Sequence, residues 1–567
     1  MSAASGDQPQ DQPKDVLLFA RRIERALGEV SLRLMRSALS LPLAAGYELG
    51  CVFTDPQGRA IAEAGADPVL TGSLGPQIRA VLAATPTLAR DVVLALSDPY
   101  PPAAGPLDGG IDLQTLTLIG PVHVGESSEL CGYLALAVRH PQPPLGAPLS
   151  RTELPPSRDD ELSALPPAVG PRYAEFQAPV PPTALPRTLD EEGRRLPARL
   201  ATDALLRELA THGRSPRERL GDLLAQRAAL RFAVSRLREL VIRYGSERFQ
   251  ALAAAVLREG EAEARQALAA LPDGVYAFAD SLDDDSAGST DVGIRVTCRV
   301  HRGGMQLDLR ECDDAVPGPL NTTAAAVVAV VRHTLRGFVG SRSRLPSNDG
   351  LLAPVEILLR PGSLLAARPP AALALGAFET ARRLYDVLRG VLSQAAPAAA
   401  LAADCGTTSS LFLAGRSFLH REALGGGIGG GPGTLPASRR LGSSSLAAEL
   451  LERQLPVRVW RHAVRPDSGG GGTHTGTSGE LRELELLSDM QVTVAGDRRR
   501  RPPYGLAGGG PGLVGRDTLT RAGETRLLPG KVCFQGQAGD RLTLQTPGGG
   551  GYGDVQRAAF FVALLGE

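Results

Sequence analysis

The chain has 567 residues, which is too long for one hydrophobic core, so we expect several domains. Its apolar fraction of 43% and charged fraction of 22% are typical of a globular protein. The formal net charge is +0 at pH 7, so bulk charge gives no reason to expect nucleic acid or an acidic membrane as partner. There is no N-terminal signal pattern and no apolar run of about 18 residues, so we expect a cytoplasmic protein.

Lysine and cysteine usage argues against several kinds of site. Lys14 and Lys531 are the only lysines, which disfavours Schiff-base chemistry. The six cysteines are scattered without a CxxC pair, which disfavours a zinc knuckle or an iron–sulfur cluster. We expect buried free thiols, and Cys405 is the one thiol that we would test as a nucleophile.

The N-terminal part predicts a polar disordered tail, residues 1–14, followed by an α+β domain, residues 15–140. Apolar residues at helical spacing predict helices at Asp15–Leu39 and Leu74–Ala83. Alternating or continuous apolar runs predict the strands Tyr47–Thr54, Arg59–Glu63, Val92–Leu96, Leu116–Val122 and Tyr133–Val138.

Two segments of different character follow. Residues 141–198 are rich in proline, which blocks helix interiors and central strands, and we expect a loop or linker there. A lid over the functional site is the alternative. Residues 199–273 predict a helical segment, because Arg219–Tyr244 and Glu247–Leu271 carry apolar stripes at helical spacing.

The next part predicts a β segment, residues 274–316, and an α/β segment, residues 317–440. The first contains Asp283–Asp285, which is similar to a cation-binding loop but lacks the glycine and the downstream glutamate of a calcium site. We favour a solvated loop. The second has the helices Thr323–Gly337 and Phe378–Ala395 around a short strand, Val355–Leu359.

A glycine-rich β region, residues 441–567, completes a multidomain α+β fold of mixed β-sheets with packed helices. Four glycine runs could be taken for phosphate-binding loops, but no GxxxxGK[ST] motif is present. We interpret them as turns that need a positive φ, and we expect no ATP site on this chain. The runs are Gly425–Gly431, Gly469–Gly472, Gly508–Gly510 and Gly548–Gly551.

The order of several motifs resembles the hydantoinase B/5-oxoprolinase family, from about Asp15 to Asp554. The motifs are PGPLNTTAAAVVAVVRHTLRGFVG, GAFETARRLYDVLRG, GDRRRRPPYGLAGGGPG and TPGGGGYGD. The resemblance implies a hetero-oligomer with a hydantoinase A-type subunit, which binds ATP and phosphorylates a lactam or carbonyl oxygen. The B-type chain then acts on the activated small molecule: 5-oxoproline, as in glutathione metabolism, or a hydantoin, with ketone carboxylation in some relatives.

The resemblance also implies a divalent metal site. Members of the family show a motif that resembles NDPYxGGTHLPD, followed by a strand pair that ends in HH. The first His of the motif, the Asp three residues later and the second His of the pair resemble a metal triad. The corresponding positions here are Asp112, Thr115 and His140. Asp112 and His140 are the expected metal ligands, with threonine a weak ligand at the third position. Arg139 replaces the first histidine of the pair, and its positive charge opposes a cation.

Further departures leave the activity open. Ala66 and Leu70 stand where relatives have histidines, and we name Asp98, Glu449 and Arg498 as candidate catalytic residues. Arg498 belongs to a cluster, residues 498–501, that could bind a phosphorylated intermediate or a carboxylate, or pair with surface charges across an interface. Two hypotheses follow: one component of an ATP-dependent cyclic-amide hydrolase, or a catalytically degenerate scaffold or regulatory component.

Overall fold

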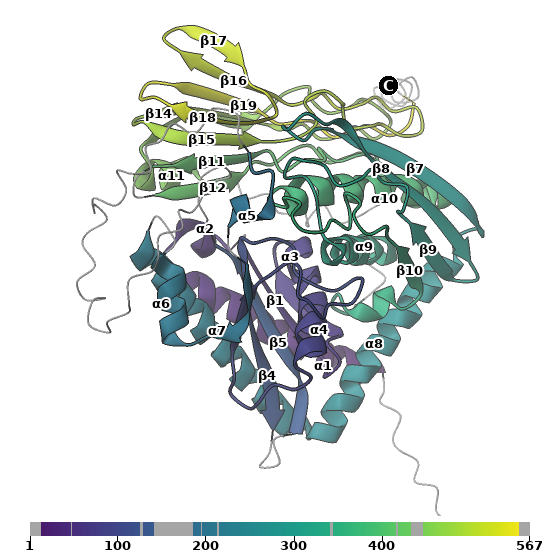
Figure 1. The fold of residues 1–567 in the computed structure, drawn as a ribbon. Helices are drawn as coiled ribbons and strands as arrows, with labels where there is room; N and C mark the ends of the chain where they lie inside the picture. The colour runs from purple at the N-terminus through teal and green to yellow at the C-terminus, as the bar shows by residue number, and fades with distance from the viewer. Residues whose placement is uncertain are drawn as a thin grey trace, which may run out of the picture.

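The computed structural model describes residues 13–46, 48–124, 129–140, 185–193, 195–211, 215–340, 344–415, 418–432 and 446–554 (Figure 1). The predicted tail lies outside these ranges except for its last two residues, which begin helix α1 (Pro13–Ser37). The predicted linker lies outside them up to residue 184. Its described end is ordered and contributes a short helix and a strand.

An antiparallel six-stranded sheet, in the order β2-β1-β5-β4-β3-β6, forms the N-terminal body. The predicted strands of residues 15–140 are confirmed, and β6 extends the sheet by pairing with β3. The predicted linker is therefore too long at this end. The strands are β1 (Leu49–Thr54), β2 (Ala60–Gly65), β3 (Leu94–Ser97), β4 (Thr115–Val124), β5 (Glu129–Arg139) and β6 (Leu196–Leu200).

Both faces of this sheet are buried under helices. Alternate side chains of a strand point to opposite faces, so one strand contributes to two cores. In β1, Cys51 and Phe53 pack in a core with the helices α1, α7 and α8, while Val52 packs in the core that contains α3 and α4. The predicted helical segment, residues 199–273, thus covers one face of the sheet. The helices of this body are α2 (Leu41–Ala44), α3 (Pro68–Gly72), α4 (Leu74–Ala84), α5 (Leu189–Glu192), α6 (Asp203–Thr211), α7 (Pro216–Tyr244) and α8 (Ser246–Ala269).

A second sheet, in the order β10-β9-β8-β7, lies beside the helices α9 and α10 (Figure 1). Helix α9 contacts α3 of the N-terminal body and also α10, which packs on the second sheet. One hydrophobic core therefore extends from the N-terminal body to the second sheet. Gly72 of α3 lies so close to Ala329 of α9 that a Cβ on it would be 2.6 Å from the alanine Cβ. The elements are β7 (Gly274–Asp284), β8 (Thr290–His301), β9 (Gly304–Asp308), α9 (Ala324–Val339), β10 (Val355–Leu358) and α10 (Ala381–Ala395).

The C-terminal region is a sandwich of two sheets, in the orders β12-β11-β15-β18 and β13-β14-β19-β16-β17. Apolar side chains of both sheets fill the space between them, among them Leu411, Val492, Leu484 and Leu542. The elements are β11 (Ser410–Ala414), β12 (Leu419–Ala423), α11 (Ala448–Gln454), β13 (Val457–Val464), β14 (Glu480–Leu486), β15 (Met490–Ala495), β16 (Arg516–Arg521), β17 (Glu524–Leu527), β18 (Lys531–Gly536) and β19 (Arg541–Gln545).

The four glycine runs pack against one another beside this sandwich. Their backbones bond directly, as in Gly430 N to Gly550 O at 2.9 Å and Gly470 N to Gly549 O at 2.8 Å. The predicted reason for the glycines is wrong, because only Gly508 in these runs has a positive φ. What excludes a side chain is close approach: a Cβ on Gly549 would lie 2.1 Å from the Ile428 carbonyl oxygen.

Two alanine substitutions test this packing. We expect Gly549→Ala to lower the free energy of unfolding by about 3 kcal/mol or more. The new Cβ would overlap the backbone of Ile428 and Gly429, so the two glycine runs must move apart. The matched control is Gly28→Ala, in the interior of α1 with open space around its Cα. We expect that change to stabilise by about 0.5–1 kcal/mol through helix propensity. Denaturant unfolding of both variants measures the difference, and an unchanged midpoint for Gly549→Ala would contradict the packing argument.

Candidate functional site

The predicted metal-site residues lie where the N-terminal sheet meets the C-terminal region. Asp112 precedes β4, and its Oδ1 accepts the backbone N–H of Thr115 at 2.8 Å. Thr115 is opposite Arg139 in the β4–β5 ladder, and the His140 backbone N–H donates to Gln114 O at 3.0 Å. The fold therefore brings Asp112, Thr115, Arg139 and His140 to one edge of the sheet.

The guanidinium of Arg139 occupies the centre of this site. Its Nη1 lies 3.0 Å from an Asp67 oxygen and 3.3 Å from a Glu48 oxygen, and its Nε lies 3.5 Å from Asp112 Oδ2. All four side chains are at least nine-tenths buried. Burial alone lowers the pKa of Arg139, but the surrounding carboxylates raise it, and the net shift is upward. Asp67 shows the converse, since Arg139 outweighs burial and lowers its pKa.

A second arginine closes the site from the C-terminal side. Arg421 of β12 forms an ion pair with Glu48, 373 positions away in the sequence. Both guanidinium groups lie against the ring of Phe378, with Cζ-to-centroid distances of 4.4 Å for Arg139 and 3.7 Å for Arg421. Phe378 belongs to a π-helical turn, Gly376–Thr380, just before α10. The aromatic face attracts both cations and separates them from solvent.

His140 faces away from this arginine cluster. Its Nε2 lies 3.2 Å from Gln226 Oε1 of α7, while the Gln226 amide nitrogen donates to two carbonyl oxygens of β4 and β5 at 2.9 Å. With both amide hydrogens engaged, Gln226 accepts from His140, so the proton of the neutral ring is on Nε2. Burial and Arg219 lower the His140 pKa to about 3, which keeps the ring neutral.

These contacts do not fit a divalent cation shared by Asp112 and His140. Asp112 faces a guanidinium, and the His140 Nε2–H is directed at Gln226. The Thr115 hydroxyl is buried without a hydrogen-bond partner and is a poor metal ligand in any case. Within the described ranges, no group of three or more His, Cys, Asp or Glu side chains is arranged to hold a metal ion.

Two of the three candidate catalytic residues, Asp98 and Arg498, are held in ion pairs with other side chains of this chain. Asp98, just after β3, accepts two hydrogen bonds from Arg195, at 2.9 and 3.0 Å, and one from the Tyr100 backbone. Arg498 is 1% exposed and pairs with Asp280 at 2.6 Å and Asp386 at 3.4 Å. Glu449 lies exposed in α11, apart from both.

The Arg498 contacts belong to a buried ionic network that the sequence did not predict. Asp497 is its centre, with Arg383 at 2.7 Å and Lys531 at 2.9 Å. Burial raises the pKa of Asp497, but the two cations outweigh it and lower the pKa well below its usual range. The partners of the Arg498 guanidinium are thus internal carboxylates, Asp280 and Asp386.

The expected solvated loop at Asp283–Asp285 is wrong for its first and last residues. Asp283 and Asp285 are 1% and 0% exposed. Asp283 accepts the backbone N–H groups of Arg499, Arg500 and Arg501 at 2.6 to 3.2 Å. It therefore fixes the loop of residues 498–501. The cysteines are buried free thiols as expected, and burial raises the pKa of Cys405, which disfavours it as a nucleophile.

Glu192 is a functional candidate that sequence reasoning missed. It ends α5, and its Oε1 accepts the backbone N–H groups of Leu373 and Ala374, both at 2.6 Å. Burial, and then the negative charge of Asp112, raise its pKa to about 8 despite these bonds. A carboxyl whose pKa is raised toward neutral pH, close enough to Asp112 to be affected by its charge, is suited to proton transfer.

Other members of the site were also missed, for identifiable reasons. Asp67 had a local signal, because an aspartate before Pro68 is typical of a helix N-cap, and it does accept the Val69 N–H at 2.9 Å. Glu48, Arg421 and Phe378 had none, because only the tertiary fold brings them to Arg139.

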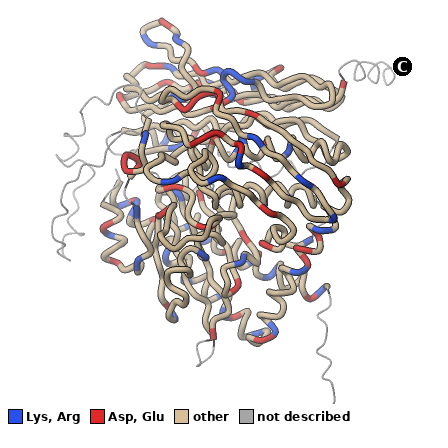
Figure 2. The backbone as a smooth tube through the Cα atoms, turned by 45° about the vertical axis from the view of Figure 1, so that its right-hand side comes forward, with Lys and Arg blue, Asp and Glu red and all other residues tan. Residues whose placement is uncertain are grey.

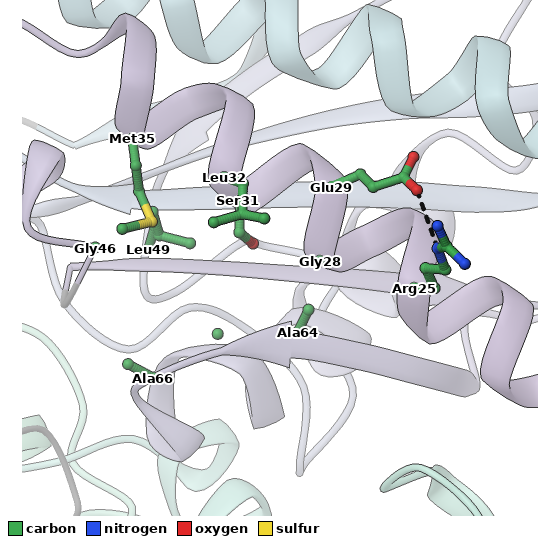
Figure 3. A pocket seen from close by; sticks show the side chains of 11 residues that line it. Arg25, Gly28, Glu29, Ser31, Leu32, Met35, Gly46, Leu49, Ala64 and Ala66 are labelled. Atoms are coloured by element: carbon green, nitrogen blue, oxygen red, sulfur yellow. Dashed lines mark hydrogen bonds and ion pairs between the residues drawn. The ribbon is translucent and has the colours of Figure 1, made fainter.

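A surface hollow lies between α1 and the β1–β2 hairpin (Figure 3). It has a volume of about 680 Å³ and is lined by Leu32, Met35, Leu49 and Ala66, with the Arg25–Glu29 ion pair at one end. Figure 2 shows acidic and basic residues interspersed along the chain, in keeping with the net charge of +0. No helix of the described part is long and apolar enough to cross a membrane.

The arrangement of sheets and packed helices defines a multidomain α+β fold that is shared with two solved structures. The structure superposes on an ATP-dependent caprolactamase from Pseudomonas jessenii with a TM-score of 0.78 at 22% identity, covering 96% of this chain and 92% of that one. A nucleotide-free acetone carboxylase gives the same TM-score at 15% identity, covering 96% of this chain and 76% of that one.

The sequence places the chain within this class. A profile of the hydantoinase B/oxoprolinase family matches residues 12–142 and 186–555, and the chain belongs to that family. It is 31% identical to 5-oxoprolinase 1 of Arabidopsis thaliana over 355 residues, 59% of this chain and 27% of that protein. It is 29% identical to a putative B-type D-/L-hydantoinase subunit of Pseudomonas sp. (strain NS671) over 367 residues, 60% of this chain and 61% of that one. The chain thus spans only about a quarter of the plant 5-oxoprolinase.

The raised pKa of Glu192 predicts a pH-dependent stability. The folded protein keeps this proton up to about pH 8, whereas the unfolded chain releases it near its ordinary pKa of 4.5. The unfolded state therefore binds fewer protons between these pH values, and stability falls as pH rises through this window. We expect Glu192→Gln, which keeps the acceptor oxygen, to flatten the fall of melting temperature between pH 5 and 8. Glu191→Gln, at its exposed neighbour, is the control, and equal slopes for both variants would refute the assignment.

Proposed function

We propose that this chain is the B-type component of an ATP-dependent enzyme that opens a cyclic amide, and that the ATP is bound by a hydantoinase A-type subunit. The observation that carries the proposal is the fold match to the caprolactamase chain, which extends over 96% of this chain and 92% of that one. The identity to a putative B-type D-/L-hydantoinase subunit supports the same division between two chains.

The chemistry explains why two components are needed. An unstrained amide resists attack by water at neutral pH, and phosphorylation of its oxygen supplies a leaving group. The chain that receives the activated molecule must position water and transfer a proton. The sequence contains no Walker A motif, and its glycine runs serve backbone packing, which supports placing ATP on the partner.

Glu192 is the residue of this chain best suited to the proton transfer. Its pKa of about 8 lets it accept or donate a proton near neutral pH, and two backbone N–H groups hold its orientation. The proposed substrate class is therefore a lactam or cyclic imide activated at its oxygen, with 5-oxoproline, hydantoin and caprolactam as the compounds to test.

One observation favours a second candidate, a catalytically degenerate chain that acts as a scaffold or regulator. The carboxylates around Arg139 form ion pairs within the chain, and Asp98 and Arg498 are likewise paired. Such a chain would still bind an A-type partner, because its fold is intact, but it would add no chemistry of its own.

Reconstitution with an A-type partner distinguishes the two candidates. Ring opening and phosphate release would be measured with each lactam, with and without ATP. We expect opening to require both chains and ATP, and Glu192→Gln to reduce turnover about 100-fold, the usual size of a lost proton transfer. Glu191→Gln should retain full turnover.

The negative results are also informative. A stable complex that opens none of the three compounds would favour the scaffold. Failure to form any complex with an A-type partner, shown by co-purification and light scattering, would contradict both candidates.

A further inference from the structure

Helix α1 carries an exposed apolar side chain on the face opposite to the one that it buries. Its buried side chains, among them Phe19, Ile23 and Leu34, pack in the core beneath the N-terminal sheet. On the outer face, Leu32 is 52% exposed, and Gly28 lies one helical turn before it. A single exposed leucine is ordinary, but this one borders empty space on its own helix.

The space lies above Gly28. A Cβ on this residue would meet no atom of the described residues within 4 Å. Glycine inside a helix is less stable than alanine, so the chain gives up helix stability here although none of its described contacts requires the glycine. The missing side chain therefore leaves room for a group that comes from outside the chain.

Gly28 opens onto the hollow between α1 and the β1–β2 hairpin (Figure 3). The walls are mostly apolar or small, with Leu32, Ala64 and Ala66 among them, and Met35 lies near one end. The volume of about 680 Å³ is large enough for an aliphatic side chain. The methionine is flexible, so this end can adapt to what enters.

We propose that this face of α1 is a docking surface for a second copy of the chain. The two α1 helices pack antiparallel about a two-fold axis, and Leu32 of each copy enters the hollow of the other above Gly28. A protruding side chain and a matching space, four residues apart on one surface, provide the self-complementarity that a two-fold contact needs. The proposal is independent of the catalytic role proposed above, and its tests do not require turnover.

The charges at the rim of the hollow also fit a second copy. Arg25 and Glu29 form an ion pair there, and Arg33 is exposed next to them, so the rim carries both signs. The register that places Leu32 opposite Gly28 of the second copy places Glu29 within one turn of Arg33 of that copy, on the same side of the helix pair. Each copy thus offers a carboxylate to an arginine of the other, whereas a partner of one sign would meet its own sign.

Sedimentation velocity of the full chain over a wide range of concentrations tests the docking. We expect a shift from the mass of one chain to that of two, with a dissociation constant in the micromolar range, because one pair of helices buries less than a standard interface. Gly28→Leu fills the hollow and Leu32→Asp removes the inserted side chain, and each should weaken association about tenfold or more. A wild type that stays monomeric throughout, or association that both variants retain, would overturn the proposal.

Two controls separate this contact from misfolding and from general stickiness. Gly28→Leu should keep the melting temperature of the dilute protein, because leucine favours a helix and its side chain meets open space. Leu18→Asp changes a leucine that is 50% exposed on the same helix but, in this register, lies beyond the end of the second α1 at Ser37. It should associate like the wild type, and a monomeric Leu18→Asp would contradict the proposed register.

A charge exchange tests the antiparallel register. Glu29→Arg and Arg33→Glu should each weaken association several-fold, and the double variant should recover it, because the pair between the copies is restored with its signs reversed. A double variant weaker than either single one would overturn the proposal. So would a chain that is monomeric alone and whose complex with an A-type subunit is broken by Gly28→Leu, since the hollow would then belong to that subunit.

Discussion

The ion pairs of Arg139 are the constraint on which the relative placement of the main bodies depends. They tie β5 to α3 and to the loop before β4, and through Glu48 and Arg421 they reach the C-terminal sheet. Removing one partner from a buried set of charges costs about 3–5 kcal/mol, far more than an exposed pair contributes. The bodies therefore cannot shift against each other at this edge without leaving charges unpaired, and a site formed between them has a fixed geometry.

The same means of attachment recurs where α10 and β7 meet the C-terminal sheets. Asp497 forms ion pairs with Arg383 of α10 and with Lys531 at the start of β18. Asp283 of β7 accepts a backbone N–H group from the loop that follows Asp497. Arginine is suited to such places because it stays charged when buried and offers several donors in one plane. An arginine-rich motif in this chain is thus a sign of internal ionic packing as much as of ligand binding, and Arg498 illustrates the difference.

Local pattern was sufficient for most of the secondary structure but not for the site. The helices α1, α7 and α8 and the strands β4 and β5 have strong apolar periodicity, so the sequence predicted them. Their packing was not predictable, because the period of α7 does not say which sheet it covers. At the site, the adjacency of Asp112, Thr115 and His140 followed from the strand pair, whereas Glu48, Asp67, Glu192 and Arg421 approach only through long-range contacts. The burial of Asp283 was missed because its partners are backbone groups of a loop more than 200 positions away.

The glycine packing has a consequence for the order in which the protein can assemble. Each glycine run finds its backbone partners in the others, as Gly430 does in Gly550 and Gly510 does in both Gly471 and Gly551. Gly548–Gly551 comes last of the four in the chain, so the amides of the earlier runs remain hydrogen-bonded to water until it is made. During synthesis on the ribosome, this part of the molecule can close only after Gly551 has emerged.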